Sequence, residues 1–85
     1  MEVVSVMGLS RIIGKSRDTI LRYERNGVFP EAPILKNNLR FYPVSLAKRL
    51  VPLVSRLPLH TRPEPSLIIE INKLFKEERD NLCRS

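Results

Sequence analysis

The chain has 85 residues, which is enough for one small domain with a modest hydrophobic core. Fifteen Lys and Arg against nine Asp and Glu give a formal net charge of +6 at pH 7, which favours a polyanionic partner. Cys83 and His60 are the only cysteine and histidine, which excludes an intramolecular disulfide and a zinc cage of thiolates and imidazoles. No apolar run approaches the ~20 residues that span a bilayer, so we expect a cytoplasmic protein that does not bind membranes.

The positive charge is concentrated in one part of the chain. Residues 1–64 contain eleven Lys or Arg and five Asp or Glu, whereas residues 65–85 contain four of each sign. The surface that meets a polyanion is therefore expected in the first three quarters of the chain, and the last segment is electrically neutral.

Two short helices are predicted near the N-terminus. Ser5 is a good N-cap for a helix over 6–13, whose apolar residues recur at helical spacing until Gly14 stops them. Ser16 can cap a second helix over 17–26, which Asn26 and Gly27 end. Two helices joined by so short a turn have the spacing of a helix-turn-helix, in which the small Ser10 permits close approach.

A β-hairpin and a third helix follow. Two short apolar runs, at 34–35 and 39–42, flank Lys36-Asn37-Asn38, and Asn tolerates the left-handed conformations that a hairpin turn requires. This segment predicts a wing, in which alternation along the strand buries Tyr42. A third helix begins at Val44, and Pro52 is expected to end or kink it.

The C-terminal third consists of a connector and a last helix. Three prolines within residues 57–65 predict an extended, fairly stiff connector. A helix opened by Pro65 or Ser66 then presents apolar residues on one side. This apolar stripe consists of Leu67, Ile71, Leu74, Phe75 and Leu82. It could fold back on the core or pair with a second copy, and the neutral charge of the segment favours a homodimer or larger oligomer through residues 66–82.

These elements together predict a mainly α fold with a small β-hairpin wing. A winged helix-turn-helix is expected over residues 1–56, the proline-rich connector over 57–65, and a C-terminal self-association helix over 66–85.

The second predicted helix carries the residues that point to function. Ile20 and Tyr23 share its inward face, so Arg17, Arg22 and Arg25 lie on the opposite side. A charged helix face is often only solvated surface, but a helix in this position fits the DNA major groove, where guanidinium groups bond guanine edges or phosphates.

Further contacts are expected around this helix. The hydroxyls of Ser16 and Thr19 lie near the helix N-terminus, where a phosphate oxygen can bind. Side chains at the hairpin can reach the DNA backbone or the minor groove. The complete candidate set for DNA binding is Ser16, Arg17, Thr19, Arg22, Tyr23, Arg25, Lys36, Asn37, Asn38 and Arg40.

Residues 3–51 resemble the DNA-binding domain of MerR-type regulators. The matching elements are a Ser-x-x-Thr helix start at Ser16, a Tyr-Glu-Arg-x-Gly helix end at Tyr23, a wing ending Arg-x-Tyr at Arg40, and an Arg-Leu pair at Arg49. The Gly-x-Phe-Pro segment from Gly27 is also similar to AlpA-like and excisionase-type regulators. The resemblance implies a winged helix that binds double-stranded DNA.

This chain departs from the MerR pattern in two respects. Leu21-Arg22-Tyr23 stands where Arg-Tyr-Tyr is usual, so the base contacts can differ. MerR-type regulators also carry a long dimerisation helix and an effector domain, whereas about twenty residues follow the connector here. Because of this second departure from the MerR pattern, we expect no small-molecule effector.

We expect a sequence-specific, nucleoid-associated DNA-binding protein, acting as a small transcriptional regulator or an excisionase-like architectural factor. The alternative is a DNA-binding assembly adaptor, such as a genome-packaging subunit or a segregation factor. The sequence contains no Gly-rich phosphate loop and no plausible pair of nucleophile and base, so neither an enzyme nor a cofactor is expected.

Overall fold

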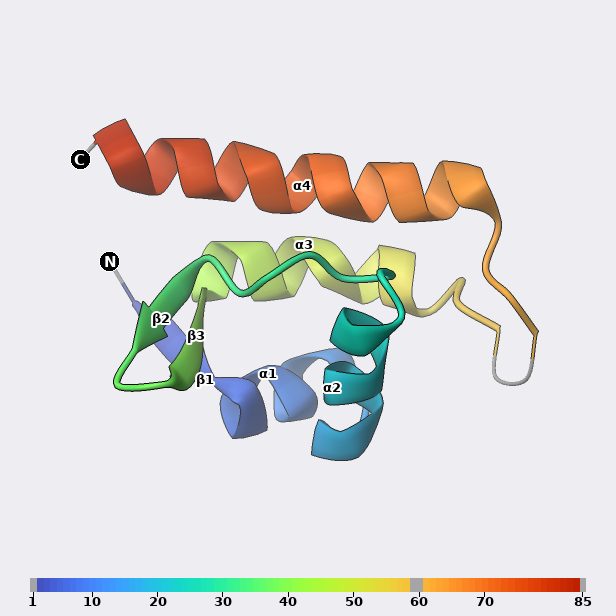
Figure 1. The fold of residues 1–85 in the computed structure, drawn as a ribbon, viewed down its shortest axis with the longest axis horizontal. Helices are drawn as coiled ribbons and strands as arrows, with labels where there is room; N and C mark the ends of the chain where they lie inside the picture. The colour runs from blue at the N-terminus through green and yellow to red at the C-terminus, as the bar shows by residue number, and fades with distance from the viewer. Residues whose placement is uncertain (1, 59–60, 85) are drawn as a thin grey trace.

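The computed structural model describes residues 2–58 and 61–84, and it forms a small α+β domain (Figure 1). The predicted connector lies partly outside the described residues, His60 lies wholly outside them, and the side chain of Cys83 is not described. In the described part of the chain the elements follow the order β1 (Val3–Ser5), α1 (Val6–Ile13), α2 (Arg17–Arg25), β2 (Ile34–Lys36), β3 (Leu39–Pro43), α3 (Val44–Val54) and α4 (Pro65–Arg84).

Local capping sets the ends of α1 and α2, as predicted. The Ser5 and Ser16 hydroxyls accept hydrogen bonds from the first turns of α1 and α2. Gly14 ends α1 at a φ of 71°, a left-handed conformation that glycine adopts without steric cost. Ser10 does more than leave space, because its hydroxyl donates a hydrogen bond to the Lys15 carbonyl and closes the turn between the helices. A close approach that requires glycine occurs at Gly8, where an added Cβ would lie 2.7 Å from Val4 Cβ.

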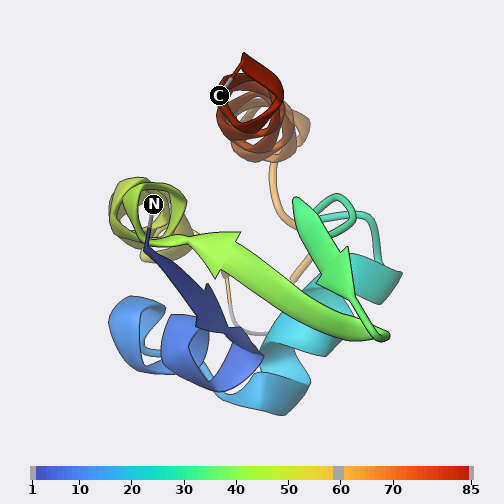
Figure 2. The same ribbon diagram turned by 90° about the vertical axis from the view of Figure 1, so that its left-hand side faces the viewer.

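The hairpin forms where the sequence predicts it, and β1 adds a strand that was not predicted. The antiparallel sheet has the order β1-β3-β2, with Val4 opposite Tyr42 (Figure 2). Asn37 and Asn38 form the turn with φ values of 54° and 65°, as a two-residue hairpin turn requires. Tyr42 is buried, as strand alternation predicted. The three residues of β1 are too few for their pattern to indicate a strand, and pairing with β3 specifies it instead.

Helix α3 continues to Val54, two residues past Pro52, so of the two predicted outcomes, an end or a kink, the structure rules out an end at Pro52. Proline removes the hydrogen bond to the carbonyl four residues earlier, which belongs to Lys48. Because Lys48 and Pro52 are both exposed, water can bond this carbonyl, and the last turn persists.

Helix α4 lies alongside α3 and runs in the opposite direction (Figure 1). Leu67, Ile71, Leu74 and Phe75 are buried in one hydrophobic core that also contains residues of α1, α2 and β3. Leu82, the fifth residue of the apolar stripe, is half-buried, so the expectation that the whole stripe is left for a second copy is corrected: the chain itself covers most of it. The physical reason is that a domain of this size gains stability from each leucine or phenylalanine it buries.

Aromatic rings join α4 to α2 through the segment that follows α2. The ring centroid of Phe29 lies 5.4 Å from that of Phe75 and 5.2 Å from that of Tyr23. Arg79 also donates a hydrogen bond of 3.0 Å to the Glu31 carbonyl. Helix α4 is thus part of the framework that holds α2 in place. No helix within residues 2–58 and 61–84 is sufficiently long and apolar to cross a membrane.

Candidate nucleic-acid interface

One face of helix α2 packs against the core, and the opposite face is exposed to solvent. Ile20 is buried in the core at 1% exposure, and Leu21 is half-buried. Arg17, Arg22 and Arg25 are all exposed, as the helical spacing predicted. The structure therefore presents three guanidinium groups on one short, capped helix of nine residues.

These three arginines have no acidic partner among the described residues. Asp18 is one turn from Arg22 on the same helix, yet no ion pair joins them. The ion pairs found in the described part of the chain are Arg40 with Glu24, Arg49 with Glu77 and Glu78, and Arg56 with Glu70. The positive charge of these three arginines is therefore not neutralised by an ion pair within residues 2–58 and 61–84.

Arg40 on β3 differs from the arginines of α2 because Glu24 binds it. Arg40 Nε lies 3.0 and 2.9 Å from the two carboxylate oxygens of Glu24, and Nη2 lies 2.7 Å from Oε1. This hydrogen bonding, ahead of other effects, raises the pKa of Arg40. A forked guanidinium–carboxylate pair is geometrically specific, so it fixes the hairpin relative to α2. From the sequence we expect Arg40 to contact DNA, and its pairing with Glu24 was not predicted.

The two hydroxyls at the start of α2 contact each other. Ser16 Oγ accepts a hydrogen bond of 3.2 Å from the Thr19 backbone N–H, so it serves as the cap. The same oxygen lies 2.8 Å from Thr19 Oγ1. Both hydroxyls therefore shape the helix start, and an anion approaching it would meet the remaining free N–H groups of the first turn.

Tyr23 is mainly a packing residue. Its ring stacks at a tilt on Phe29, and burial raises the pKa of its hydroxyl, although nearby Arg22 acts in the opposite direction. The hydroxyl therefore stays protonated near neutral pH and can donate a hydrogen bond.

The hairpin tip is exposed beside α2. Lys36, Asn37 and Asn38 are exposed, and the two asparagines form the turn itself. Arg17 and Asn38 line the same groove, of about 350 Å³, between α2 and the hairpin. Leu21 lines this groove too.

The candidate residues fall on two flanks of α2. Arg17 and Arg25 line grooves beside the hairpin, whereas Thr19, Arg22 and Tyr23 line a pocket on the other flank. Sequence reasoning missed Glu24, Lys15 and Arg62, of which the last two line that pocket. Only the Tyr-Glu-Arg-x-Gly and Arg-x-Tyr motifs could have linked Glu24 to Arg40, because charge and spacing alone give no distance across 16 residues.

No group of three or more His, Cys, Asp or Glu side chains that could hold a metal ion occurs within the described residues. We also compared the chain with models of known protein families, with curated proteins and with solved structures, and none of the three comparisons found a match. The resemblance to MerR-type regulators therefore depends on the motif residues alone.

Proposed function

We propose that α1 and α2 form a helix-turn-helix, that the β2–β3 hairpin is its wing, and that the chain binds double-stranded DNA in a sequence-specific manner. In this proposal α2 enters the major groove, whose width accommodates an α-helix. The protein then acts in the nucleoid as a small transcriptional regulator or an excisionase-like architectural factor.

One observation carries the proposal: α2 exposes three arginines that pair with no acidic residue in the described part of the chain, next to a hairpin that Glu24 and Arg40 fix in place. Elsewhere in the described part of the chain, Arg49 on α3 and Arg56 just after α3 each pair with a glutamate of α4. Unpaired guanidinium groups on a rigid helix can form bidentate bonds with guanine or clamp phosphates.

The geometry suggests a division of roles. Arg22 and Arg25 project from the exposed side of α2, so they are the candidates for base contacts. Lys36, Asn37 and Asn38 at the hairpin tip are candidates for contacts with the DNA backbone. Arg40 supports the wing through Glu24, and its other guanidinium nitrogen can still face a phosphate.

We also propose that the chain binds DNA as a homodimer or a larger assembly, since a single winged domain has a small interface. Because the apolar stripe is buried, residues 66–82 would contribute only exposed positions such as Ile69. Solution mass, measured with and without DNA, tests this part separately; a monomer in both states contradicts it.

Selection from a random duplex library tests the central proposal. The wild type should enrich a defined motif. Arg25→Gln should lose part of that motif, whereas Lys48→Gln, the same charge change at an exposed site on α3, should retain it. Failure to enrich any duplex, or equal loss in both variants, would overturn the assignment of α2.

A further inference from the structure

A pocket of about 480 Å³ lies on the flank of α2 that faces away from the hairpin. Its walls come from the turn before α2, from α2 itself, from the connector and from the first turn of α4. None of the α2 residues that line it also lines the grooves beside the hairpin. The pocket is therefore a separate feature, and nothing in the DNA-binding proposal accounts for its concave shape.

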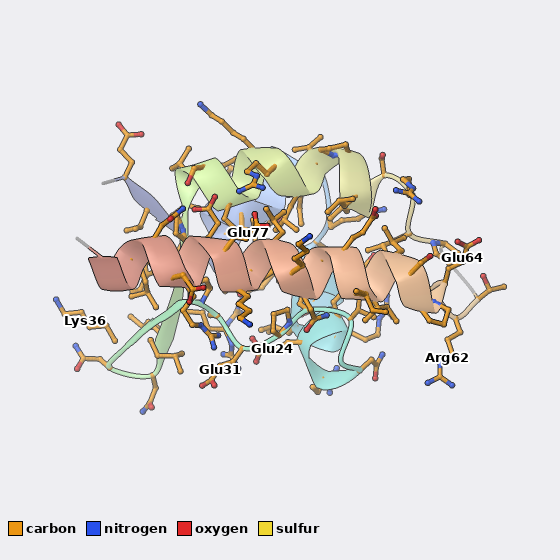
Figure 3. All side chains as sticks on the ribbon, turned by 90° about the horizontal axis from the view of Figure 1, so that it is seen from above. Glu24, Glu31, Lys36, Arg62, Glu64 and Glu77 are labelled. Carbon is orange, nitrogen blue, oxygen red and sulfur yellow. The ribbon has the colours of Figure 1, made fainter. Side chains whose placement is uncertain are left out.

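Three cations surround this pocket: Lys15, Arg22 and Arg62. No Asp or Glu lines it, and none of the three forms an ion pair within residues 2–58 and 61–84. Glu64 and Arg62 line a neighbouring pocket together, but no ion pair joins them and Glu64 does not line this one; Figure 3 labels both side chains on the connector. Three like charges around one cavity repel one another, and an anion bound between them would relieve that repulsion.

The remaining wall of the pocket is largely apolar. Val28, Pro58 and Ile68 supply apolar surface, and Tyr23 adds its ring. Pockets of roughly 300–1,000 Å³ with apolar walls and a few convergent polar groups are typical of small-molecule sites. A bare phosphate ion would use only the cations and leave the apolar wall unoccupied. The occupant that fits both parts has an anionic head and an apolar body.

We propose that this pocket binds a small organic phosphate monoester whose aromatic or aliphatic body packs on the apolar wall. A monoester carries roughly −1.5 to −2 charges near pH 7, which suits three cations better than a carboxylate or a phosphodiester with a single charge. The forked guanidinium groups of Arg22 and Arg62 can each bond two phosphate oxygens. The hydroxyl of Tyr23, which lines the pocket, is a further possible donor.

A duplex backbone is the other source of phosphate, and two features argue against it. Each phosphodiester is singly charged, and a convex duplex leaves the apolar wall without a partner. Because Arg22 lies both in the pocket and on the exposed face of α2, the monoester would withdraw Arg22 from DNA. That coupling rests on the proposed function, whereas binding of the monoester does not. The sequence-based expectation of no small-molecule effector is replaced by this proposal.

Calorimetric titration of the intact chain without DNA tests the proposal, with phenyl phosphate as the probe. Phenyl phosphate should bind at least about tenfold more tightly than inorganic phosphate, because the buried ring adds 1.4 kcal/mol or more, and phenol should not bind. Arg62→Gln should weaken phenyl phosphate at least about tenfold, while the matched Lys48→Gln variant binds like the wild type. No binding of phenyl phosphate, or equal affinity in the two variants, overturns the proposal.

Duplex-binding measurements with and without phenyl phosphate distinguish a small phosphate monoester from the DNA backbone as the occupant of the pocket. Phenyl phosphate at a concentration close to its wild-type Kd should weaken duplex binding by the wild type and leave duplex binding by Arg62→Gln nearly unaffected. If phenyl phosphate does not bind, and Arg62→Gln weakens duplex binding while Lys48→Gln does not, the pocket holds the DNA backbone and the proposal is wrong. If no duplex binds, the calorimetric result still decides the pocket, and only the DNA-binding function fails.

Discussion

The face formed by α3 and α4 and the face formed by α2 and the hairpin use arginine in opposite ways. On the first, Arg49 lies 2.9 Å from Glu77 and 3.2 Å from Glu78, and Arg56 lies 3.2 Å from Glu70. On the second, the arginines of α2 have no acidic partner among the described residues. What distinguishes Arg49 and Arg56 from the arginines of α2 is therefore their pairing with glutamates. Arg49 and Arg56 link α4 to α3 and to the residues just after α3, and we propose that the arginines of α2 bind another molecule.

Glu78 has a structural role in the contact between α3 and α4. Its side chain is buried, and it accepts hydrogen bonds from Ser45 at 2.9 Å and from Arg49 at 3.2 Å. A buried carboxylate is tolerated only when such partners compensate for lost hydration. Arg40 combines features of the paired and the unpaired arginines. It pairs with Glu24, yet it lies beside the exposed arginines of α2.

The largest expected effect comes from removing a buried residue of α4. Phe75→Ala should lower the free energy of unfolding by about 3–5 kcal/mol, since it deletes a ring that packs on Phe29. Ile69→Ala, at a position that is 66% exposed on the same helix, should change it by less than about 0.5 kcal/mol. Denaturant unfolding of both variants measures this. Equal, small losses would mean that α4 does not belong to the core.

The next effect concerns alkaline pH. Burial, ahead of the charge of Glu24, raises the pKa of Tyr42 to about 12 from a usual value of 10.0. The folded state therefore keeps a proton that the unfolded state loses, and stability that is fully present below pH 10 declines as the pH rises to 12. An increase in pKa from 10.0 to about 12 corresponds to a loss of at most about 2.7 kcal/mol in the free energy of unfolding. Tyr42→Phe should remove most of this decline in unfolding measurements at pH 9–12, and an unchanged decline would contradict the burial of the hydroxyl.

A paired and an unpaired arginine should give opposite results when each is changed to alanine. Arg49→Ala should cost about 1–2 kcal/mol of unfolding free energy, because Glu78 loses one of its two partners, and should leave DNA binding unchanged. Arg25→Ala should leave stability within about 0.5 kcal/mol and reduce discrimination between cognate and scrambled duplexes by about 1–3 kcal/mol. Unfolding and duplex-binding assays on both variants test this contrast, which fails if the two variants behave alike.

The smallest effect is expected at the intermediate arginine. Arg40→Ala should weaken binding to cognate and scrambled duplexes equally, by about 0.5–1.5 kcal/mol, because it loosens the hairpin without removing a base contact. Glu24→Gln, which keeps the shape but not the charge of the partner, should have a weaker effect of the same kind. A loss confined to the cognate duplex would instead make Arg40 a base-reading residue.

Much of this molecule follows from local sequence signals. Ser5, Gly14 and Ser16 set helix ends, and the two asparagines set the hairpin turn, because capping and turn chemistry act over a few residues. The exposed arginines of α2 follow from helical spacing around Ile20. These parts could be predicted before any tertiary contact was known.

What could not be predicted depends on contacts between distant segments. Strand β1 exists because it pairs with β3, and α4 covers the core although its stripe alone suited a second copy equally well. The Glu24–Arg40 pair joins residues 16 positions apart, and the pocket brings Lys15 together with Arg62. Periodicity shows which face of a helix is apolar, but it does not specify what that face meets.

The salt dependence of duplex binding tests the central contrast most directly. Each phosphate that a cation neutralises should contribute about 0.9 to the slope of log affinity against log salt. The account predicts a steep negative slope for the wild type and for Lys48→Gln, and a slope smaller by about two to three in the variant with Arg17, Arg22 and Arg25 all changed to Gln. An equal slope in the triple variant, or a flat response in the wild type, would contradict the claim that the unpaired arginines of α2 form the DNA-binding face.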